Sequence, residues 1–156
     1  MSSAIPALKA ALRDVARDLW PDAQTYRAVP PIDKPRDLAV IGDARATITR
    51  PTTGGASRSR EESAEVELIV SCYRPVGLDK LDDDGVQLVA SMAAWAMLDQ
   101  LHDWLRIRGN ETLRGVCRDA WVSETEDHDY PLLTDDGLLA GRCTDITITI
   151  TAATRI

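Results

Sequence analysis

A strongly apolar helical segment, residues 86–108, constrains the fold of this chain more than any other stretch. Its sequence is VQLVASMAAWAMLDQLHDWLRIR, and every residue from 92 to 98 is apolar. Two apolar lines run along the predicted helix, so we expect its middle to be covered on more than one side. The first line is Val86, Val89, Ala93, Met97, Leu101 and Trp104, and the second is Leu88, Met92 and Trp95.

Charges at the two ends of this segment match a helix dipole. Asp82, Asp83 and Asp84 precede it, and Arg106 and Arg108 close it. Residues 79–85 resemble a calcium-binding loop only superficially, because Lys80 and Ser91 would stand where acidic ligands are needed. We therefore interpret the aspartates as a charged turn and helix start.

The remaining segments predict an α/β (α+β) fold. Apolar residues recur at helical spacing through residues 5–19, and strand-like patterns occupy residues 25–29, 38–50, 64–73, 116–124 and 146–151. Gly42 is expected to mark a bulge or a bend in the strand 38–50. The order of elements indicates a mainly antiparallel or mixed sheet of about five strands, with the two helices packed on one face.

Composition indicates an ordinary soluble domain. The chain has 156 residues, which fits a single domain spanning 1–156. Its net charge of −7 does not suit a general binder of nucleic acid or anionic membranes. No apolar run reaches the roughly 20 residues of a membrane span, and Lys9 and Arg13 interrupt any N-terminal signal. Three widely spaced cysteines, Cys72, Cys117 and Cys143, suggest reduced thiols in a cytosolic compartment.

A flexible loop is predicted at about residues 51–62, inside a long hairpin. Residues 51–61 read PTTGGASRSRE and contain no large apolar anchor. Arg50, Arg58 and Arg60 give the loop a local positive charge in an acidic protein. Two interpretations stay open here: a solvated loop without function, and a segment that orders against a partner.

No motif in the sequence predicts catalysis, a metal site or a cofactor. There is no G-x-S-x-G motif, no phosphate-binding glycine motif and no C-x-x-C pair. Asp127-His128-Asp129 lacks a partner spaced to complete a cation site, so residues 124–136 are interpreted as a solvated acidic loop. His102 is interpreted as structural, although a pairing with one of the cysteines remains an alternative.

Over nearly its full length the chain resembles the tail terminator, or tail-completion, proteins of long-tailed bacteriophages. The resemblance rests on the N-terminal amphipathic helix, the strand pair ending in AEVELIVSCYR, the Ala/Trp-rich helix after an acidic turn, and the C-terminal strand DITITITA. It implies an α/β fold that assembles as a ring, commonly a hexamer. Such a ring caps the growing tail tube, stops its polymerisation and provides the surface that joins the head.

The resemblance also implies partners and a location. The partners are further copies of the chain, the tail-tube protein and head–tail connector proteins, with DNA passing through the lumen without specific binding. The location is the virion tail, and the host cytoplasm during assembly. No enzyme activity is implied. The predicted loop would then meet the tube or a neighbouring subunit, through Arg50, Thr52, Thr53, Gly54, Gly55, Arg58, Arg60, Glu61 and Glu62.

Three further hypotheses accompany this interpretation. The acidic stretches at 79–84 and 124–136 would face the lumen, where they repel DNA. A head–tail connector or neck protein is the alternative within virion assembly. A small cytosolic enzyme or ligand-binding domain, using His102 and a cysteine, is the alternative from another class.

Overall fold

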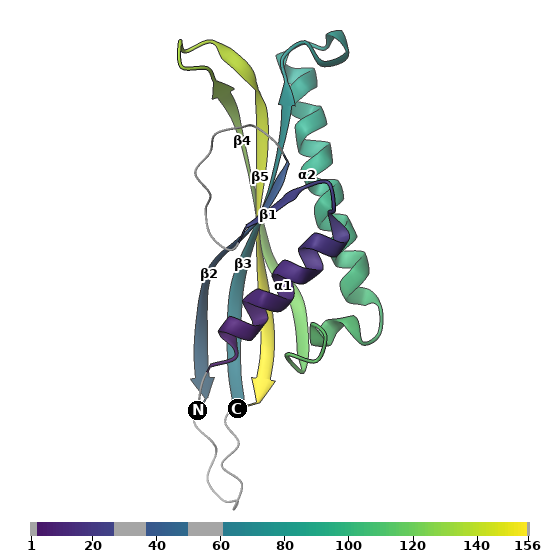
Figure 1. The fold of residues 1–156 in the computed structure, drawn as a ribbon, viewed down its shortest axis with the longest axis vertical. Helices are drawn as coiled ribbons and strands as arrows, with labels where there is room; N and C mark the ends of the chain where they lie inside the picture. Colours follow the sequence, from purple (N-terminus) through teal and green to yellow (C-terminus); the bar gives the residue numbers. More distant parts are fainter. Residues whose placement is uncertain (1–2, 27–36, 50–60, 156) are drawn as a thin grey trace, which may run out of the picture.

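The computed structural model describes residues 3–26, 37–49 and 61–155 of the chain. Its elements, in chain order, are α1 (Ile5–Leu19), β1 (Gln24–Tyr26), β2 (Leu38–Thr49), β3 (Glu61–Pro75), the 3₁₀ turn η1 (Leu78–Lys80), α2 (Asp83–Arg106), the 3₁₀ turn η2 (Asn110–Thr112), β4 (Asp119–Leu133) and β5 (Leu139–Arg155). The strands form one sheet in the order β1-β2-β3-β5-β4, and both α-helices lie on one face of it (Figure 1). The predicted α+β fold, with a five-stranded mixed sheet and two helices, is confirmed.

β3 and β5 form the centre of the sheet. They pair antiparallel without interruption from Glu61 opposite Arg155 to Pro75 opposite Gly141. β2 and β4 pair antiparallel on either side, and β1 adds a short parallel pair along β2. A register shift between Ile41 and Ala44 confirms the bulge predicted at Gly42. β4 is an edge strand of the sheet.

Alternation along β3 and β5 turns one side of each strand toward the helices. The residues on that side are at most 1% exposed and form the centre of the hydrophobic core: Val66, Leu68, Val70, Cys72, Ile146, Ile148 and Ile150. The intervening residues, which include Glu65, Glu67, Thr147 and Thr149, point to the other side. We call that side, which no α-helix covers, the open face of the sheet.

α1 packs its apolar stripe on β1, β2 and β3, as its sequence predicts. Leu8, Leu12 and Val15 are at most 1% exposed. The helix starts after Ala4, which gives no side-chain cap, and Pro6 occupies its first turn. Ser3 Oγ accepts a hydrogen bond from the Ile5 backbone N–H at 3.2 Å, and a carboxylate of β3, described below, also contacts this helix start.

α2 packs on β5, β3 and β4 with a face that is shifted from the predicted one but shares Val86, Met97 and Leu101 with it. Its buried residues are Val86, Ala90, Ala94, Met97, Leu98 and Leu101. Ala90 and Ala94 are fully buried because small side chains let the helix approach the sheet closely. Trp104, predicted to be central to the core, is only half-buried at its margin.

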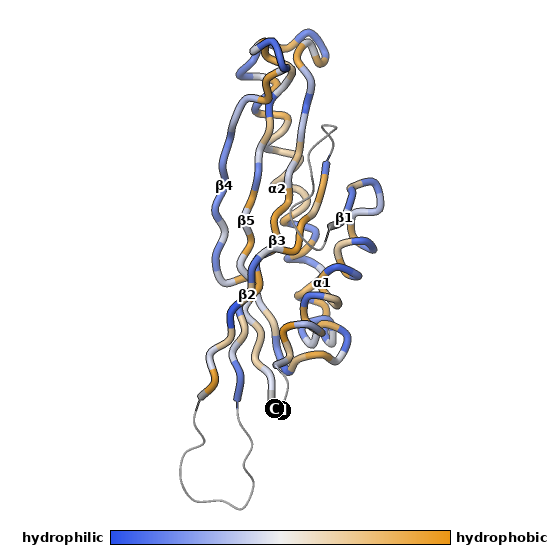
Figure 2. Tube along the Cα trace, turned by 60° about the vertical axis from the view of Figure 1, so that its left-hand side comes forward, coloured by the Kyte–Doolittle hydropathy of each residue, from blue (hydrophilic) through white to orange (hydrophobic). Residues whose placement is uncertain are grey.

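The acidic stretch that was predicted to be a loop is a strand. Residues 124–133 belong to β4 and pair with β5 as far as Leu133 opposite Leu139. Figure 2 shows β4 as a mainly hydrophilic strand beside the more apolar β5. β5 supplies the hydrogen-bonding partners that hold this polar sequence extended. The prediction of a solvated loop is therefore wrong for residues 124–133, whereas Asp135 and Asp136 lie in the exposed turn between β4 and β5.

Candidate assembly surfaces

Most of the residues predicted to bind a partner lie outside the described residues. These are Arg50, Thr52, Thr53, Gly54, Gly55, Arg58 and Arg60. Glu61 and Glu62, predicted as the end of the loop, are the first two residues of β3. Glu61 is exposed and pairs with Arg118 at 3.3 Å, so it remains accessible to a partner.

Glu62 is buried beneath the start of α1. It is 1% exposed, and its Oε1 accepts hydrogen bonds from Ser3 Oγ at 2.8 Å and from the Ala4 backbone N–H at 3.2 Å. A carboxylate at a helix N-terminus interacts favourably with the helix dipole and with free N–H groups. In the isolated chain this residue ties β3 to α1 and is not part of an accessible surface.

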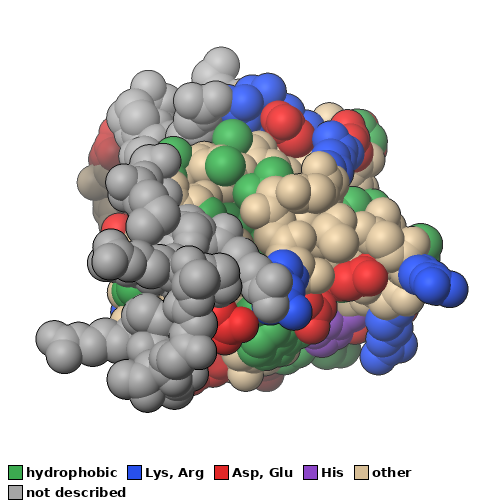
Figure 3. Space-filling view, turned by 90° about the horizontal axis from the view of Figure 1, so that it is seen from below, with side chains coloured by type: hydrophobic (Ala, Val, Ile, Leu, Met, Phe, Trp, Pro, Cys, Tyr) green, Lys and Arg blue, Asp and Glu red, His purple; other side chains and the backbone are tan. Residues whose placement is uncertain are grey.

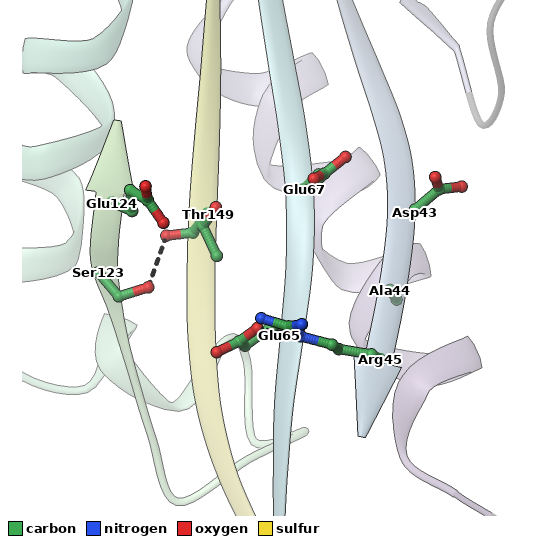
Figure 4. Close-up of a pocket in the computed structure, with 8 residues that line it drawn as sticks. All are labelled: Asp43, Ala44, Arg45, Glu65, Glu67, Ser123, Glu124 and Thr149. Atoms are coloured by element: carbon green, nitrogen blue, oxygen red, sulfur yellow. Dashed lines mark hydrogen bonds and ion pairs between the residues drawn. The ribbon is translucent and has the colours of Figure 1, made fainter. Parts of the chain in front are cut away.

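Carboxylates gather in a shallow hollow on the open face of the sheet. The hollow has a volume of about 410 Å³ and is lined by residues of β2, β3, β4 and β5 (Figure 4). Asp43, Glu67 and Glu124 stand around it, while Glu65 pairs with Arg45 at 2.5 Å. The lining contains neither a cysteine nor a histidine. Its excess of negative charge disfavours the approach of phosphate groups.

The triplet Asp127-His128-Asp129 does not form one site. Because side chains alternate along β4, Asp127 and Asp129 point to the side opposite His128. Asp129 accepts a hydrogen bond from Thr144 Oγ1 at 2.6 Å, and the His128 ring stacks on Tyr130. Among the residues that the structure describes, no group of three His, Cys, Asp or Glu side chains could hold a metal ion.

The three thiols are buried and their chemistry is suppressed. Burial raises the pKa of Cys72 to about 12 and that of Cys117 to about 11, and burial also raises the pKa of Cys143. A thiol needs its thiolate form to act as a nucleophile. Cys72 Sγ contacts Met97 Sδ at 3.4 Å, and in the described part of the chain no hydrogen bond joins His102 to a cysteine. These contacts do not favour the enzyme alternative.

The outer surface of α2 carries a line of exposed large apolar side chains, which we call the α2 stripe. Leu88 is 59% exposed, Met92 63% and Trp95 37%. The sequence correctly identifies these residues as a second apolar line. The cover expected for this side of α2 is not supplied by α1, which packs on β1, β2 and β3. Their spacing places them on one side of the helix, away from the sheet.

Aspartates border the α2 stripe at both ends. Residues 82–105 contain five aspartates and neither Lys nor Arg. Asp82 caps the helix, with its Oδ1 accepting from the Gly85 backbone N–H at 2.8 Å. Asp99 and Asp103 are exposed one to two turns beyond Trp95. A surface that covers the stripe therefore needs apolar groups at its centre and cations around them.

No family model matches this chain, and no curated protein matches it. None of the helices in the described ranges has both the length and the apolar character that crossing a membrane requires.

Proposed function

We propose that the chain is a structural assembly protein of a long-tailed bacteriophage, which forms a ring on the end of the tail tube. The ring stops tube polymerisation and presents the surface to which the head is joined. Its partners are further copies of the chain, the tube protein and the head–tail connector proteins. The resemblance to tail terminators implies a ring on the tail tube, and the surfaces of the folded chain support the proposal that it assembles.

The observation that carries the proposal is the exposed α2 stripe. Three large apolar side chains on one helix face are costly to leave in water, since each is worth about 1.5–3 kcal/mol when fully buried. α1 packs on other strands of the same sheet and leaves the stripe uncovered. Exposed clusters of this kind mark contact surfaces between proteins.

The acidic open face of the sheet is suited to line the lumen of the ring, through which DNA passes. Asp43, Glu67 and Glu124 surround the hollow, and Glu126 adds a further exposed acid on β4. A sheet face of this charge, turned toward the lumen, would repel phosphates weakly and let DNA pass without binding. Replacing these four acids with Gln or Asn should therefore slow DNA passage, and unchanged infectivity would count against the lumen assignment.

The direct test of the function is to remove the protein from the infecting phage and measure tail length by electron microscopy. A terminator is required to stop growth, so its loss should give tubes that extend beyond the normal length. Tails of normal length that fail to join heads would instead identify a head–tail connector. Normal, infectious particles would contradict both.

A further inference from the structure

We infer that the α2 stripe of one subunit is covered by the turn that follows α2 in a second copy of this chain. We call this segment, residues 106–108 with the sequence Arg-Ile-Arg, the basic turn. The inference rests on the proposed function, because it assigns the contact between neighbouring subunits of the ring. It is carried by the exposed apolar residues of both surfaces, by their opposite charges and by the hydrogen bonds that hold the basic turn.

The α2 stripe has the composition of an interface anchor. Trp and Met are enriched where proteins meet, and a few such residues provide most of the affinity. Trp95 is 37% exposed, so part of its ring is already held in place by its own chain. Met92, the most exposed of the three at 63%, lies between Trp95 and Leu88. The stripe is about 10 Å long, since a helix rises about 1.5 Å per residue.

The basic turn has an apolar centre with a cation on each side. Ile107 is 59% exposed, and Arg106 and Arg108 beside it are exposed as well. None of the ion pairs among the described residues involves Arg108, and Arg106 approaches Asp103 only to 3.8 Å, with both side chains largely exposed. Because an exposed pair of this kind is weak, both guanidinium groups are available to a partner.

The charges of the two surfaces are opposite. Residues 82–105 contain five aspartates and neither Lys nor Arg, whereas residues 106–118 contain four arginines and one acid, Glu111. In the view from below, Lys and Arg side chains protrude at the edge of the molecule (Figure 3). An apolar stripe bordered by carboxylates therefore meets, in the basic turn of a second copy, an apolar residue bordered by cations.

Hydrogen bonds on both sides of Ile107 hold the basic turn in place. The Ile107 backbone N–H donates to the Trp104 carbonyl at 3.2 Å, and the Ile107 carbonyl accepts from the Asn110 backbone N–H at 3.0 Å. Asn110 Nδ2 donates to the Trp104 carbonyl at 2.9 Å, and the Gly109 N–H donates to Glu111 Oε2 at 2.6 Å. A segment that is already ordered loses less conformational entropy when it binds.

The basic turn cannot reach the α2 stripe of its own chain. Met92 and Ile107 are fifteen residues apart along the same helix and its end, which corresponds to about 22 Å along the helix axis. Figure 1 shows α2 running from its start near the top of the molecule to its end in the lower half. The contact between these two surfaces is therefore intermolecular.

A reciprocal pair, in which each copy covers the stripe of the other, is electrostatically unfavourable. With Ile107 of each copy opposite Met92 of the other, the two antiparallel helices would cross at Asp99. Asp99 lies about one turn beyond Trp95, on the same side of the helix, so the two carboxylates would meet at the crossing. We therefore expect a heterologous contact, and such contacts generate rings when the rotation closes.

The first experiment measures subunit association for three exposed-site variants, with the tube protein added if the ring needs it. Met92→Glu and Ile107→Glu should each weaken association about 30-fold or more, the effect of losing an interface anchor. The matched control is Leu138→Glu, because Leu138 is 67% exposed and follows two exposed aspartates, Asp135 and Asp136, in the turn between β4 and β5. We expect the control to change the Kd less than about threefold. Circular dichroism should show all three variants to be folded.

The second experiment identifies the contacting surfaces by oxidative cross-linking. The variants Ile107→Cys and Met92→Cys are oxidised separately and then as a mixture; the native cysteines are buried and do not compete. A covalent dimer that forms only in the mixture supports the inference. A dimer from either variant alone, or a ring that forms without any cross-link in the mixture, overturns it.

The outcomes separate this inference from the function on which it rests. A ring that tolerates Met92→Glu or Ile107→Glu as well as it tolerates Leu138→Glu would overturn the interface and leave the proposed function standing. A chain that stays monomeric, alone and with the tube protein, would overturn both.

Discussion

At the residue scale, Glu62 occupies a position where a charged side chain is rarely found. It is 1% exposed, and its two hydrogen bonds go to the first residues of α1. Glu62→Ala would leave Ser3 Oγ and the Ala4 N–H without their acceptor. We expect a loss of about 1–3 kcal/mol in the free energy of unfolding, measured by urea denaturation.

The neighbouring glutamate is the control for this effect. Glu61 pairs with Arg118 at an exposed site, and exposed ion pairs contribute little to stability. Glu61→Ala should leave the urea midpoint almost unchanged. Equal effects of the two substitutions would show that Glu62 does not cap α1.

Leu101 and Met92 distinguish the two sides of α2 by their contribution to stability. Leu101 is 1% exposed, so Leu101→Ala should reduce the free energy of unfolding by about 2–5 kcal/mol. Met92→Ala should cost less than about 1 kcal/mol in the monomer, because the side chain is 63% exposed. Thermal unfolding of both variants measures the difference. A larger loss of stability in Met92→Ala than in Leu101→Ala would show that Met92, and not Leu101, faces the core.

The buried thiol of Cys72 gives the fold a sensitivity to alkaline pH. Burial raises its pKa from 9.0 to about 12, with Asp37 adding to the effect. The folded chain therefore keeps a proton that the unfolded chain releases, so this contribution is complete below pH 9 and is lost as pH rises toward 12. One such group gives a slope of up to about 1.4 kcal/mol per pH unit.

Substitution of this residue tests the assignment. Cys72→Ala should flatten the fall in unfolding free energy between pH 9 and 11, measured by denaturant titration at each pH. An unchanged slope would mean that the Cys72 thiol does not ionise on unfolding. The comparison is made within the variant across pH, so any constant loss of packing cancels.

At the scale of elements, the strands and helices with simple apolar periods could be predicted from the sequence. Alternating isoleucines in β5 and the apolar stripe of α1 point to their buried sides without further information. β4 could not be predicted beyond its start, because Glu126, Asp127 and Asp129 have low strand propensity and no apolar alternation. Its extended form depends on pairing with β5, which is a contact distant in sequence.

The candidate surfaces were also only partly predictable, because they depend on contacts with residues distant in the sequence or with other molecules. The sequence predicts that the line of Leu88, Met92 and Trp95 is covered, but it does not show by what. An apolar helix face has the same pattern whether its own chain or a neighbour covers it. Glu62 read as part of a loop, because its cap on α1 depends on residues almost sixty positions earlier. The arginines of residues 50–60 were predicted to bind a partner, and that prediction stays untested.

Residues 52–59 are predicted to contribute little to the stability of the fold. Replacing residues 52–59 with a short Gly/Ser link should change the unfolding free energy by less than about 1 kcal/mol, since the cost of closing a loop varies slowly with its length. The same change should weaken assembly, because it removes Thr52, Gly54 and Arg58, which are predicted to meet a partner. Loss of cooperative unfolding in the shortened chain would show that this segment is part of the fold.

At the scale of the whole molecule, the chain combines a well-buried core with contact surfaces that it does not satisfy alone. The core joins both helices to the sheet, while the α2 stripe stays exposed and the open face of the sheet collects acids. A ring would cover the first surface and could turn the second toward a lumen. Assembly is therefore the central claim about this protein.

Solution mass by light scattering tests that claim most directly, on the full chain alone and then mixed with the purified tail-tube protein. We predict a ring-sized species, present either in the chain alone or only after the tube protein is added. A strict monomer whose mass is indifferent to the tube protein would contradict the claim.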